Sequence, residues 1–324
     1  MKAWRAMRYG GPEVLELVDA PRPTAAANEV VVEVIAASLN PLDWHQLRGE
    51  PWLVRITGGL RRPKTGAVGT DVAGVVVETG TGVTHLRVGD RVVGTATHSL
   101  AAFAAARADR VVPLPDGLDA VAAAGLPVAG VTALQALRLG NVGSSTRVLV
   151  IGASGGVGTF AVQLAAANGA VVTGVCSTAN VVLVRELGAT EVIDRTTNEL
   201  DRLTGPFDAI VDCVGSLSFR RCKALLVRGG RYVVVGGPDG GRLLGPLTHL
   251  ARAKLAFVLG GRSAHPMIAT ITADDLNELT AAFAADRLRV VVDRVVPLDD
   301  VPDAIRHLET KRARGKVLVE VRLG

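Results

Sequence analysis

Cysteine, aromatic residues and long apolar runs are all scarce in this sequence. Its three cysteines, Cys176, Cys213 and Cys222, show no Cys-x-x-Cys spacing, which argues against a disulfide framework and against a structural zinc site. A reducing compartment such as the cytoplasm fits this pattern best. With 3 Trp, 2 Tyr and 6 Phe in 324 residues, the chain also has too few rings for a surface on which single-stranded nucleic acids stack.

No segment of the sequence has the length of a membrane span. The longest apolar stretch, Val121–Leu137, is interrupted by Gly125, Pro127 and Gly130 and is shorter than the about 20 residues that cross a bilayer. The formal net charge of +5 comes from scattered basic residues; most of it is expected to be solvated surface charge, with attraction of an anionic ligand as the alternative. The sequence therefore predicts a soluble cytoplasmic protein with no nucleic-acid or membrane partner and, since its N-terminus has no apolar core, no secretory signal.

The chain is long enough for about two domains of roughly 150 residues each. The first third alternates short β-branched segments with turns, as at Val30–Val34, Val72–Glu78 and Arg91–Val93, and this pattern predicts a β-rich, barrel-like domain. After the turn at Pro115-Asp116-Gly117, an alanine-rich helical stretch, Asp119–Leu139, begins.

From Arg147 onward, apolar strands alternate with helical segments about every 20 to 25 residues, which is typical of a parallel sheet covered by helices. Six strands are expected: Arg147–Ile151, Ala170–Val175, Glu191–Ile193, Ala209–Asp212, Arg231–Val235 and Leu255–Leu259. Helices are expected at Val157–Asn168, Ala179–Leu187, Leu217–Leu226, loosely after Pro246, and at Ala273–Ala285. The tail returns to a strand pattern at Val290–Val296 and Lys316–Val321 and is expected to rejoin the N-terminal domain. The resulting limits are residues 1–122 with 288–324 for one domain and residues 123–287 for the other.

The strongest chemical signal is the turn Gly152-Ala153-Ser154-Gly155-Gly156-Val157-Gly158, which follows the first of these strands and opens the first of these helices. A diphosphate can sit at a helix N-terminus only where the preceding turn has no side chains in the way. Gly155 would let the backbone approach the ligand, and Gly158 would let the helix lie close to the strand. Because strand, turn and helix are all in place, the segment predicts a dinucleotide site; the alternative is a tight turn that binds nothing.

The end of the second strand indicates which dinucleotide binds. Sites that prefer NAD carry Asp or Glu about 20 residues after the glycine turn, where it accepts hydrogen bonds from the ribose hydroxyls. Here the segment Val175–Asn180 contains no acid and offers hydroxyl and amide groups that can donate to a 2′-phosphate, so NADPH is favoured. The nearest cations are Arg185 and Arg195, and Arg195 is expected beside the phosphate because it follows the third strand; its alternative is a solvated loop charge.

With these features the sequence resembles the zinc-independent quinone oxidoreductase (zeta-crystallin-like) branch of the medium-chain dehydrogenase/reductase superfamily over nearly its whole length. The resemblance rests on the glycine turn and on the segments Ala37–Asp43 with Arg48-Gly49, Gly69–Gly74, Val88–Val92, Pro127–Ala133 and Ala313–Lys316. It implies an α/β protein in which a GroES-like, β-rich domain built from both chain ends carries an inserted Rossmann domain with a doubly wound parallel sheet. The family also suggests a homodimer.

The resemblance further implies that no metal is bound. Zinc-dependent relatives hold a catalytic zinc with a Cys in the early loop and a His-Glu pair, and a structural zinc with four clustered Cys. This sequence has Asn40 and Thr70-Asp71 at the corresponding places and no cysteine cluster, whereas a tetrahedral zinc site needs thiolate and imidazole ligands. Without a metal to polarise a carbonyl, the acceptor must take hydride readily, as quinones and α,β-unsaturated carbonyls do, while the protein supplies orientation.

The expected site residues fall into a catalytic and a cofactor group. By resemblance Asn40 and Asp43 lie near the nicotinamide pocket, and His45 is the group there that can donate a proton near neutral pH; the alternative for His45 is a bond to a neighbouring carbonyl. The resemblance also implies the cofactor residues, which are Thr132 beside the middle of the dinucleotide, Ser154, Gly155, Gly156, Val157 and Gly158 at the diphosphate, Ser177 and Thr178 at the adenosine phosphate, Val214 and Gly236 at the ribose and nicotinamide, and Arg314 at the outer rim. Arg195 is expected at the adenosine phosphate from its place after the third strand.

The leading hypothesis is an NADPH-dependent oxidoreductase that transfers hydride to a small-molecule quinone or α,β-unsaturated carbonyl without zinc. The alternative is a protein that binds NADPH without turnover, as a redox sensor or scaffold, and a zinc alcohol dehydrogenase is the least favoured hypothesis. The sequence leaves open the physiological substrate and whether the segment Gly49–Gly66 is a lid or a surface excursion.

Overall fold

The structure is a computed structural model that describes residues 1–66, 68–197, 200, 203–236, 246–257 and 260–321. By its contacts the chain divides into two compact units, residues 1–131 with 271–324 and residues 132–270. The limits predicted from the sequence, 122/123 and 287/288, differ from these. The later limit differs because helix α10 (Ala273–Ala284) contacts strand β7 (Val111–Pro113) and is counted with the first unit.

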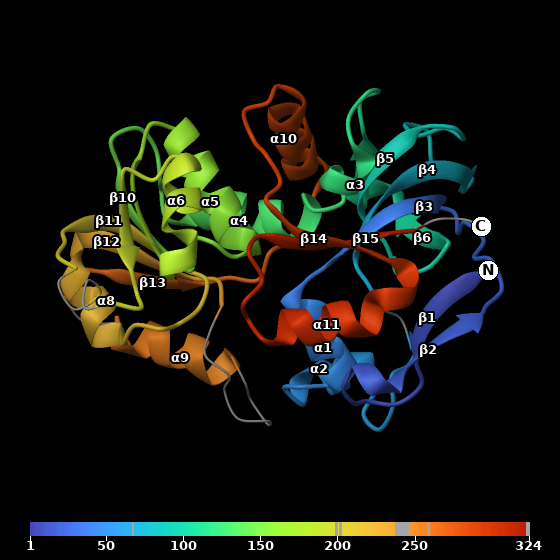
Figure 1. Ribbon diagram of the computed structural model, residues 1–324, viewed down its shortest axis with the longest axis horizontal. Helices are drawn as coiled ribbons and strands as arrows, with labels where there is room; N and C mark the ends of the chain where they lie inside the picture. Colours follow the sequence, from blue (N-terminus) through green and yellow to red (C-terminus); the bar gives the residue numbers. More distant parts are fainter. Residues whose placement is uncertain (67, 198–199, 201–202, 237–245, 258–259, 322–324) are drawn as a thin grey trace. The chain divides into compact units, whose positions relative to one another are not determined.

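The first unit is β-rich, and the larger of its two sheets contains seven strands (Figure 1). Its strand order is β14-β15-β3-β4-β5-β7, with β6 paired to β3, and β1 and β2 form a separate antiparallel pair. Near the C-terminus β15 pairs antiparallel with β3, so the tail joins the N-terminal domain as the sequence predicts. The strands are β1 (Lys2–Ala6), β2 (Leu15–Asp19), β3 (Glu29–Leu39), β4 (Asp71–Thr79), β5 (Arg91–Thr95), β6 (Phe103–Arg107), β7, β14 (Val292–Pro297) and β15 (Lys316–Glu320).

Helices of this unit begin where the sequence supplies a start signal. Helix α1 follows Asn40 and has Pro41 in its first turn, a position where the missing N–H of proline has no intrahelical partner to lose. The other helices of this unit are α2 (Leu53–Gly58), α3 (Ala120–Ala123), α10 and α11 (Val301–Glu309), and α1 itself spans Pro41–Arg48. Helix α4 (Pro127–Leu139) begins in this unit, and from Thr132 onward it belongs to the second unit. Helix α11, which the sequence pattern does not predict, buries Val301, Ala304 and Ile305 in a core shared with Leu39 and Leu47.

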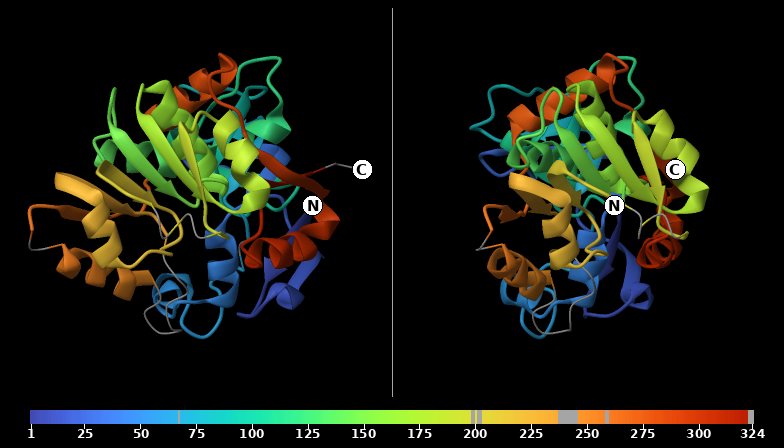
Figure 2. Two further views of the ribbon diagram at one scale, coloured as in Figure 1. Left: turned by 60° about the vertical axis from the view of Figure 1, so that its left-hand side comes forward. Right: turned by 90° about the vertical axis from the view of Figure 1, so that its left-hand side faces the viewer.

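In the described part of the second unit, six strands form one sheet in the order β10-β9-β8-β11-β12-β13, with all neighbouring strands parallel (Figure 2). This is the doubly wound order, in which the direction of winding reverses between β8 and β11. β8 (Arg147–Ile151) has four almost fully buried residues after Arg147, as expected for a central strand covered on both faces. The other elements are α5 (Gly156–Ala167), β9 (Val171–Cys176), α6 (Val181–Glu186), β10 (Glu191–Asp194), β11 (Phe207–Asp212), α8 (Phe219–Leu225), β12 (Leu226–Val234), α9 (Pro246–Ala256) and β13 (Ser263–Pro266).

The sixth strand lies at Ser263–Pro266 and not at Leu255–Leu259, so that prediction is wrong. The first two residues of the predicted strand end helix α9, and residues 258–259 lie outside the described residues. Ala253 and Phe257 are buried, while Leu255 between them is 75% exposed. Burial at a spacing of four residues is the periodicity of a helix face, which an apolar run read as a strand conceals.

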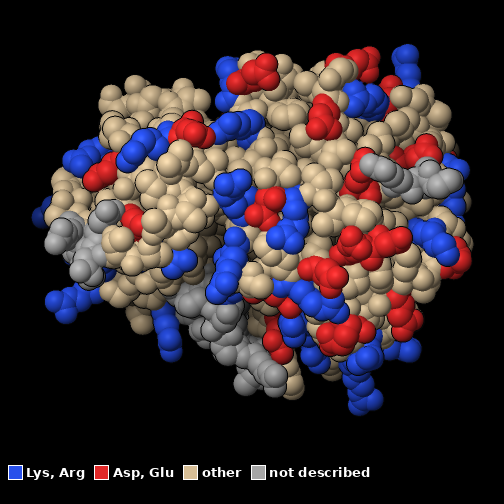
Figure 3. Space-filling view, viewed as in Figure 1, with Lys and Arg blue, Asp and Glu red and all other residues tan. Residues whose placement is uncertain are grey.

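Within the ranges given above, no helix combines the length and apolar character needed to cross a bilayer. On the face shown in Figure 3, Lys and Arg side chains are interspersed with Asp and Glu, in agreement with the scattered basic residues of the sequence.

Candidate functional site

The glycine turn after β8 has room for a ligand at one of its glycines. Gly152 has a φ of +83°, a left-handed conformation that favours glycine. A Cβ on Gly158 would lie 2.1 Å from the carbonyl oxygen of Gly152, so close packing of turn and helix requires glycine there. A Cβ on Gly155 would meet only that same oxygen, at 3.5 Å. Packing among the described residues therefore does not require glycine at position 155, and apart from its chain neighbours they leave the space within 4 Å of such a Cβ otherwise open.

Helix α5 presents a bare N-terminus to that space. Its N-cap is Gly155, and no described side chain caps it. The first helical bond runs from the N–H of Thr159 to the carbonyl of Gly155, at 2.9 Å, so the N–H groups of the three residues between them have no intrahelical acceptor. The positive end of the helix dipole favours an anion at this position. The arrangement fits the diphosphate of a dinucleotide.

The connection after β9 lies against the glycine turn. The side-chain amide of Asn180 donates to Ser154 Oγ at 3.1 Å and to Ser177 Oγ at 3.2 Å. The N–H of Arg195 donates to the carbonyl of Cys176 at 2.8 Å, which places the exposed Arg195 beside the same connection. The structure thus brings together three residues expected at the dinucleotide, and it adds Asn180, which the sequence analysis includes in the segment but not among the site residues.

An acid that the sequence analysis does not consider lies next to this connection. Asp194 ends β10, and its carboxylate accepts hydrogen bonds from Thr178 Oγ1 at 2.6 Å and from the hydroxyl and N–H of Thr196 at 2.6 and 2.8 Å. The bond from Thr178, followed by those from Thr196, lowers the pKa of Asp194. The hydroxyl proton of Thr178 is therefore used within the protein, and both protons of the Asn180 amide are donated to the two serines. The serine hydroxyls and the guanidinium of Arg195 remain as donors to a 2′-phosphate. The only signal in the sequence is the place of Asp194 directly before Arg195.

Two further turns reach the same edge of the sheet, after β11 and β12. Val214 packs against the glycine turn, because a Cβ on Gly152 would come within 2.6 Å of Val214 Cγ2. The N–H of Gly236 donates to the carbonyl of Asp212 at 3.1 Å, and a Cβ on Gly236 would lie 2.2 Å from the carbonyl oxygen of Cys213. The carboxyl ends of β8, β9, β11 and β12 thus gather most of the residues expected at the cofactor.

The two remaining expected cofactor residues lie elsewhere in the fold. Thr132 is on α4, where its side chain is buried. Arg314 is exposed in the segment before β15, and its N–H donates to Asp293 Oδ1 at 3.0 Å. Their roles toward a dinucleotide stay predictions.

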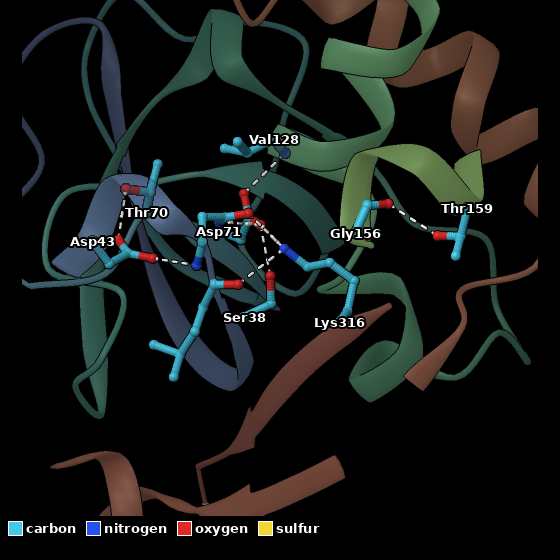
Figure 4. A network of polar contacts seen from close by, with 10 residues as sticks. Ser38, Asp43, Thr70, Asp71, Val128, Gly156, Thr159 and Lys316 are labelled. Atoms are coloured by element: carbon cyan, nitrogen blue, oxygen red, sulfur yellow. Dashed lines mark hydrogen bonds and ion pairs between the residues drawn. The ribbon is translucent and has the colours of Figure 1, made fainter. Parts of the chain in front are cut away.

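In the first unit, a buried polar cluster joins the ends of several elements (Figure 4). Asp71, the first residue of β4, accepts hydrogen bonds from Ser38 Oγ at 2.6 Å, from Asn40 Nδ2 at 2.8 Å and from the N–H of Val128 at 3.0 Å. Lys316, the first residue of β15, donates from Nζ to Asn40 Oδ1 at 2.6 Å and lies 3.4 Å from Asp71 Oδ2. Asp71 is fully buried and Lys316 is 2% exposed. The cluster therefore contains a buried ion pair and ties β3, α1, β4, α4 and β15 together.

This cluster does not fit a zinc ion. The positions at which the resemblance would place zinc ligands, Asn40, Thr70 and Asp71, offer an amide, a hydroxyl and a carboxylate, and neither thiolate nor imidazole. Oxygens of Asn40 and Asp71 are already bonded to the ammonium of Lys316. Elsewhere in the described residues, no three His, Cys, Asp or Glu side chains gather where they could hold a metal ion. An ammonium group supplies the positive charge of this cluster.

The three residues expected to act near the nicotinamide lie together around α1. Asp43 Oδ2 accepts the N–H of Asn40 at 2.6 Å, and both side chains are almost fully buried. Nδ1 of His45 lies 2.9 Å from the carbonyl oxygen of Glu50, and the imidazole stacks on the ring of Trp44 with centroids 3.6 Å apart. The contact to Glu50 is the alternative that the sequence leaves open for His45. The polar atoms of Asn40 and Asp43 hold this loop in shape.

Burial gives Asp43 an effect on the pH dependence of stability. It raises the pKa of Asp43 to about 7, and Asp71 adds to the rise, whereas the bond from the N–H of Asn40, the charge of Lys316 and the bond from Thr70 oppose it. An unfolded Asp titrates at about pH 3.9, so between about pH 4 and about pH 7 the folded chain binds more protons here than the unfolded chain. This contribution therefore favours folding most below about pH 4 and is lost as the pH rises through about 7.

We expect Asp43→Asn to remove this contribution. Asparagine does not titrate and still accepts the N–H of Asn40, so the free energy of unfolding of the variant should rise relative to wild type between about pH 4 and about pH 7. Urea denaturation of both proteins at the two ends of this range measures the difference. Other titrating groups cancel in the comparison, and a constant difference between the two proteins would show that Asp43 titrates normally.

Comparison with known proteins gives relatives over the whole chain. Residues 26–116 match the family model of the alcohol dehydrogenase GroES-like domain, and residues 187–319 match that of the zinc-binding dehydrogenase. The chain is 35% identical to the chloroplast envelope quinone oxidoreductase homolog of Arabidopsis thaliana, over 98% of this chain and 99% of that protein. It is 31% identical to the 2-methylene-furan-3-one reductase of Solanum lycopersicum, over 98% of this chain and 79% of that protein.

Solved structures show the same architecture. The quinone oxidoreductase from Coxiella burnetii has a TM-score of 0.87 and 31% identity, and the match covers 99% of both chains. The Escherichia coli quinone oxidoreductase complexed with NADPH has a TM-score of 0.82 and 27% identity, covering 99% of this chain and all of that one. The predicted fold class, a GroES-like domain with a doubly wound parallel sheet, is confirmed by these matches.

Proposed function

The chain belongs to the quinone oxidoreductase branch of the medium-chain dehydrogenase/reductase superfamily, and we propose that it is an NADPH-dependent reductase of quinones or α,β-unsaturated carbonyls that works without zinc. The observation that carries the proposal is the bare N-terminus of α5 with open space in front of Gly155. Support comes from relatives that are named as quinone oxidoreductases and as a 2-methylene-furan-3-one reductase, and from a neighbour solved with NADPH.

In this proposal the second unit binds the cofactor along the carboxyl ends of its strands. The N–H groups of Gly156, Val157 and Gly158 donate to the diphosphate, and Gly155 allows it to approach. The hydroxyl of Ser177 and the guanidinium of Arg195 hold the 2′-phosphate, and the amide of Asn180 orients Ser177 by donating to its oxygen. Turns after β11 and β12, with Val214 and Gly236, lie along the ribose and nicotinamide.

The acceptor must suit a site that has no Lewis acid. When bound, NADPH supplies the hydride. A quinone or an α,β-unsaturated carbonyl delocalises the charge that the transfer creates, so the chain needs to bind, orient and shield the acceptor but not to polarise an isolated carbonyl. Asn40 and Asp43 contribute by holding the loop around α1, because their polar atoms are engaged there. His45 stays the predicted proton donor, and a cytoplasmic homodimer stays the predicted state of the protein.

Steady-state turnover tests the proposal. The full chain, treated with a chelator, is offered NADPH or NADH together with quinones, α,β-unsaturated ketones and saturated aldehydes. We expect oxidation of NADPH with the first two acceptor classes and none with saturated aldehydes. We expect NADPH to bind at least about tenfold more tightly than NADH, because a hydrogen bond to a charged group contributes about 1.5–3 kcal/mol.

Three different results would each reject one part of the proposal. Tight NADPH binding without turnover on any acceptor would favour the non-catalytic sensor or scaffold. Tighter binding of NADH would remove the 2′-phosphate roles of Ser177 and Arg195. Reduction of saturated aldehydes that depends on added zinc would identify a zinc alcohol dehydrogenase.

A further inference from the structure

A buried carboxylate holds the turn that follows β11. Asp212 is the last residue of β11 and is fully buried. Its Oδ1 accepts the N–H groups of Val214 at 3.0 Å and Gly215 at 2.7 Å. Gly215 has a φ of +75°, which glycine adopts without strain. The carboxylate therefore fixes a sharp turn, Cys213–Gly215, directly after the strand.

The other oxygen of this carboxylate is bonded from the core. Tyr232, in β12, is fully buried, and its hydroxyl donates to Asp212 Oδ2 at 2.8 Å. The Tyr232 ring stacks on Phe257 with centroids 5.2 Å apart and meets Phe219 edge-on at 6.1 Å. Burial, with the neighbouring Asp212 charge, raises the pKa of Tyr232 far above its ordinary value. The hydroxyl thus keeps its proton and its bond to Asp212.

The turn held in this way lies on the path of the proposed dinucleotide. In a doubly wound sheet the ligand crosses the carboxyl ends of the strands where the winding reverses, here between β8 and β11. The proposal places the 2′-phosphate of the adenosine half at the end of β9, on one side of β8. The nicotinamide half must then pass the end of β11, on the other side. Val214 is 46% exposed there, and its Cγ2 packs over Gly152.

We propose that Tyr232 and Asp212 are positioning residues for NADPH, which act by fixing the Cys213–Gly215 turn against the nicotinamide half of the cofactor. This inference rests on the proposed function. Neither side chain touches the ligand. Loss of the Tyr232 hydroxyl removes one hydrogen bond from this buried carboxylate, which is then held less firmly. A carboxylate that can shift loosens the turn that its other oxygen holds.

The test compares two ligands on Tyr232→Phe in the full chain. NADPH probes the whole path, whereas 2′,5′-ADP probes only the adenosine half at the ends of β8 and β9. We expect the dissociation constant of NADPH to rise about tenfold in the variant and that of 2′,5′-ADP to stay within about twofold of wild type. Isothermal titration calorimetry measures both constants, and thermal unfolding reports the stability of each protein.

Two further variants separate positioning from general destabilisation. Ile210→Val removes one methylene from the same buried strand and should lower the melting temperature without changing either dissociation constant. Asp212→Asn keeps an oxygen for the two N–H groups and an amide for the oxygen of Tyr232, so its NADPH affinity should stay within about threefold of wild type.

Three results would overturn the inference. The first is a Tyr232→Phe variant with wild-type NADPH affinity, which would make the hydroxyl purely structural. The second is an equal weakening of both ligands, which would mean that the whole unit is disturbed. The third is an Asp212→Asn variant that binds NADPH as weakly as Tyr232→Phe. A wild-type protein that binds neither ligand would instead reject the proposed function itself.

Discussion

Replacing Gly155 with valine is expected to weaken NADPH binding by at least about 100-fold, or roughly 3 kcal/mol, while the protein stays folded. The backbone at Gly155 is extended, with φ −82° and ψ 175°, and valine adopts this conformation readily. Its Cβ would meet only the Gly152 oxygen, at the ordinary contact distance of 3.5 Å. The added side chain then occupies the space that the diphosphate needs in front of α5. Calorimetric titration with NADPH and urea denaturation measure the two effects.

Other glycines of the same unit provide matched controls for this variant. Gly158→Val places a Cβ 2.1 Å from a backbone oxygen, so it should destabilise the fold on the order of 3 kcal/mol. A Cβ on Gly143 would have no neighbour within 4 Å, and Gly143→Val should change neither stability nor affinity much. A Gly155→Val protein that binds NADPH as wild type does would remove the glycine turn from cofactor binding.

Lys316→Met is expected to destabilise the protein by about 3–5 kcal/mol. The ammonium is buried and bonded to Asn40, to the carbonyl of Leu39 at 3.2 Å and to Asp71. Its removal leaves Asp71 as a buried carboxylate without its counter-ion, and breaking a buried pair from one side costs about that much. Urea denaturation measures the loss. A second substitution, Asp71→Asn, should restore part of the stability because it removes the uncompensated charge.

An exposed lysine gives the control for this prediction. Lys2 pairs with Asp19 at 2.9 Å, and their side chains are 59% and 77% exposed. Lys2→Met should cost less than about 1 kcal/mol, as is usual for surface pairs. If Lys316→Met costs no more than Lys2→Met, the buried pair does not stabilise the first unit.

The sequence predicts correctly those elements whose local residue pattern matches the place they take in the folded protein. The turn from Gly152 to Gly158 is recognisable because strand, glycines and helix follow one another within a short segment. Parallel strands read from apolar runs at Arg147–Ile151 and Ala209–Asp212 lie where expected, since a strand buried on both faces has no competing polar pattern. The predicted strand Ala170–Val175 lies one residue before β9 at both ends, and the predicted strand Glu191–Ile193 ends one residue before β10 does.

The local residue pattern predicts a wrong element at Leu255–Leu259 and no element where α11 lies. The run Leu255–Leu259 has the composition of a strand, yet Ala253 and Phe257 face the core from a helix and its end. Helix α11 was missed although Val301, Ala304 and Ile305 have the spacing of one helix face. Its residues outside that face are mostly charged or polar, so composition alone does not distinguish it from a loop.

The polar contacts of the candidate site depend on residues that are far apart in the sequence. Lys316 and Asn40 are 276 residues apart, and Tyr232 and Asp212 are 20 apart. Lys316 belongs to a recognisable closing segment, but nothing local shows that its ammonium faces Asp71. The bond from Thr178 to Asp194 likewise appears only when β9 and β10 are paired. Such pairings follow from sheet order and register, which the sequence pattern does not specify.

A crystal structure of the full chain with NADPH would show directly whether the glycine turn binds the cofactor. We expect diphosphate oxygens within hydrogen-bonding distance of the N–H groups of Gly156, Val157 and Gly158, and the 2′-phosphate beside Ser177 and Arg195. A complex in which NADPH binds elsewhere and leaves the turn before α5 empty would contradict it.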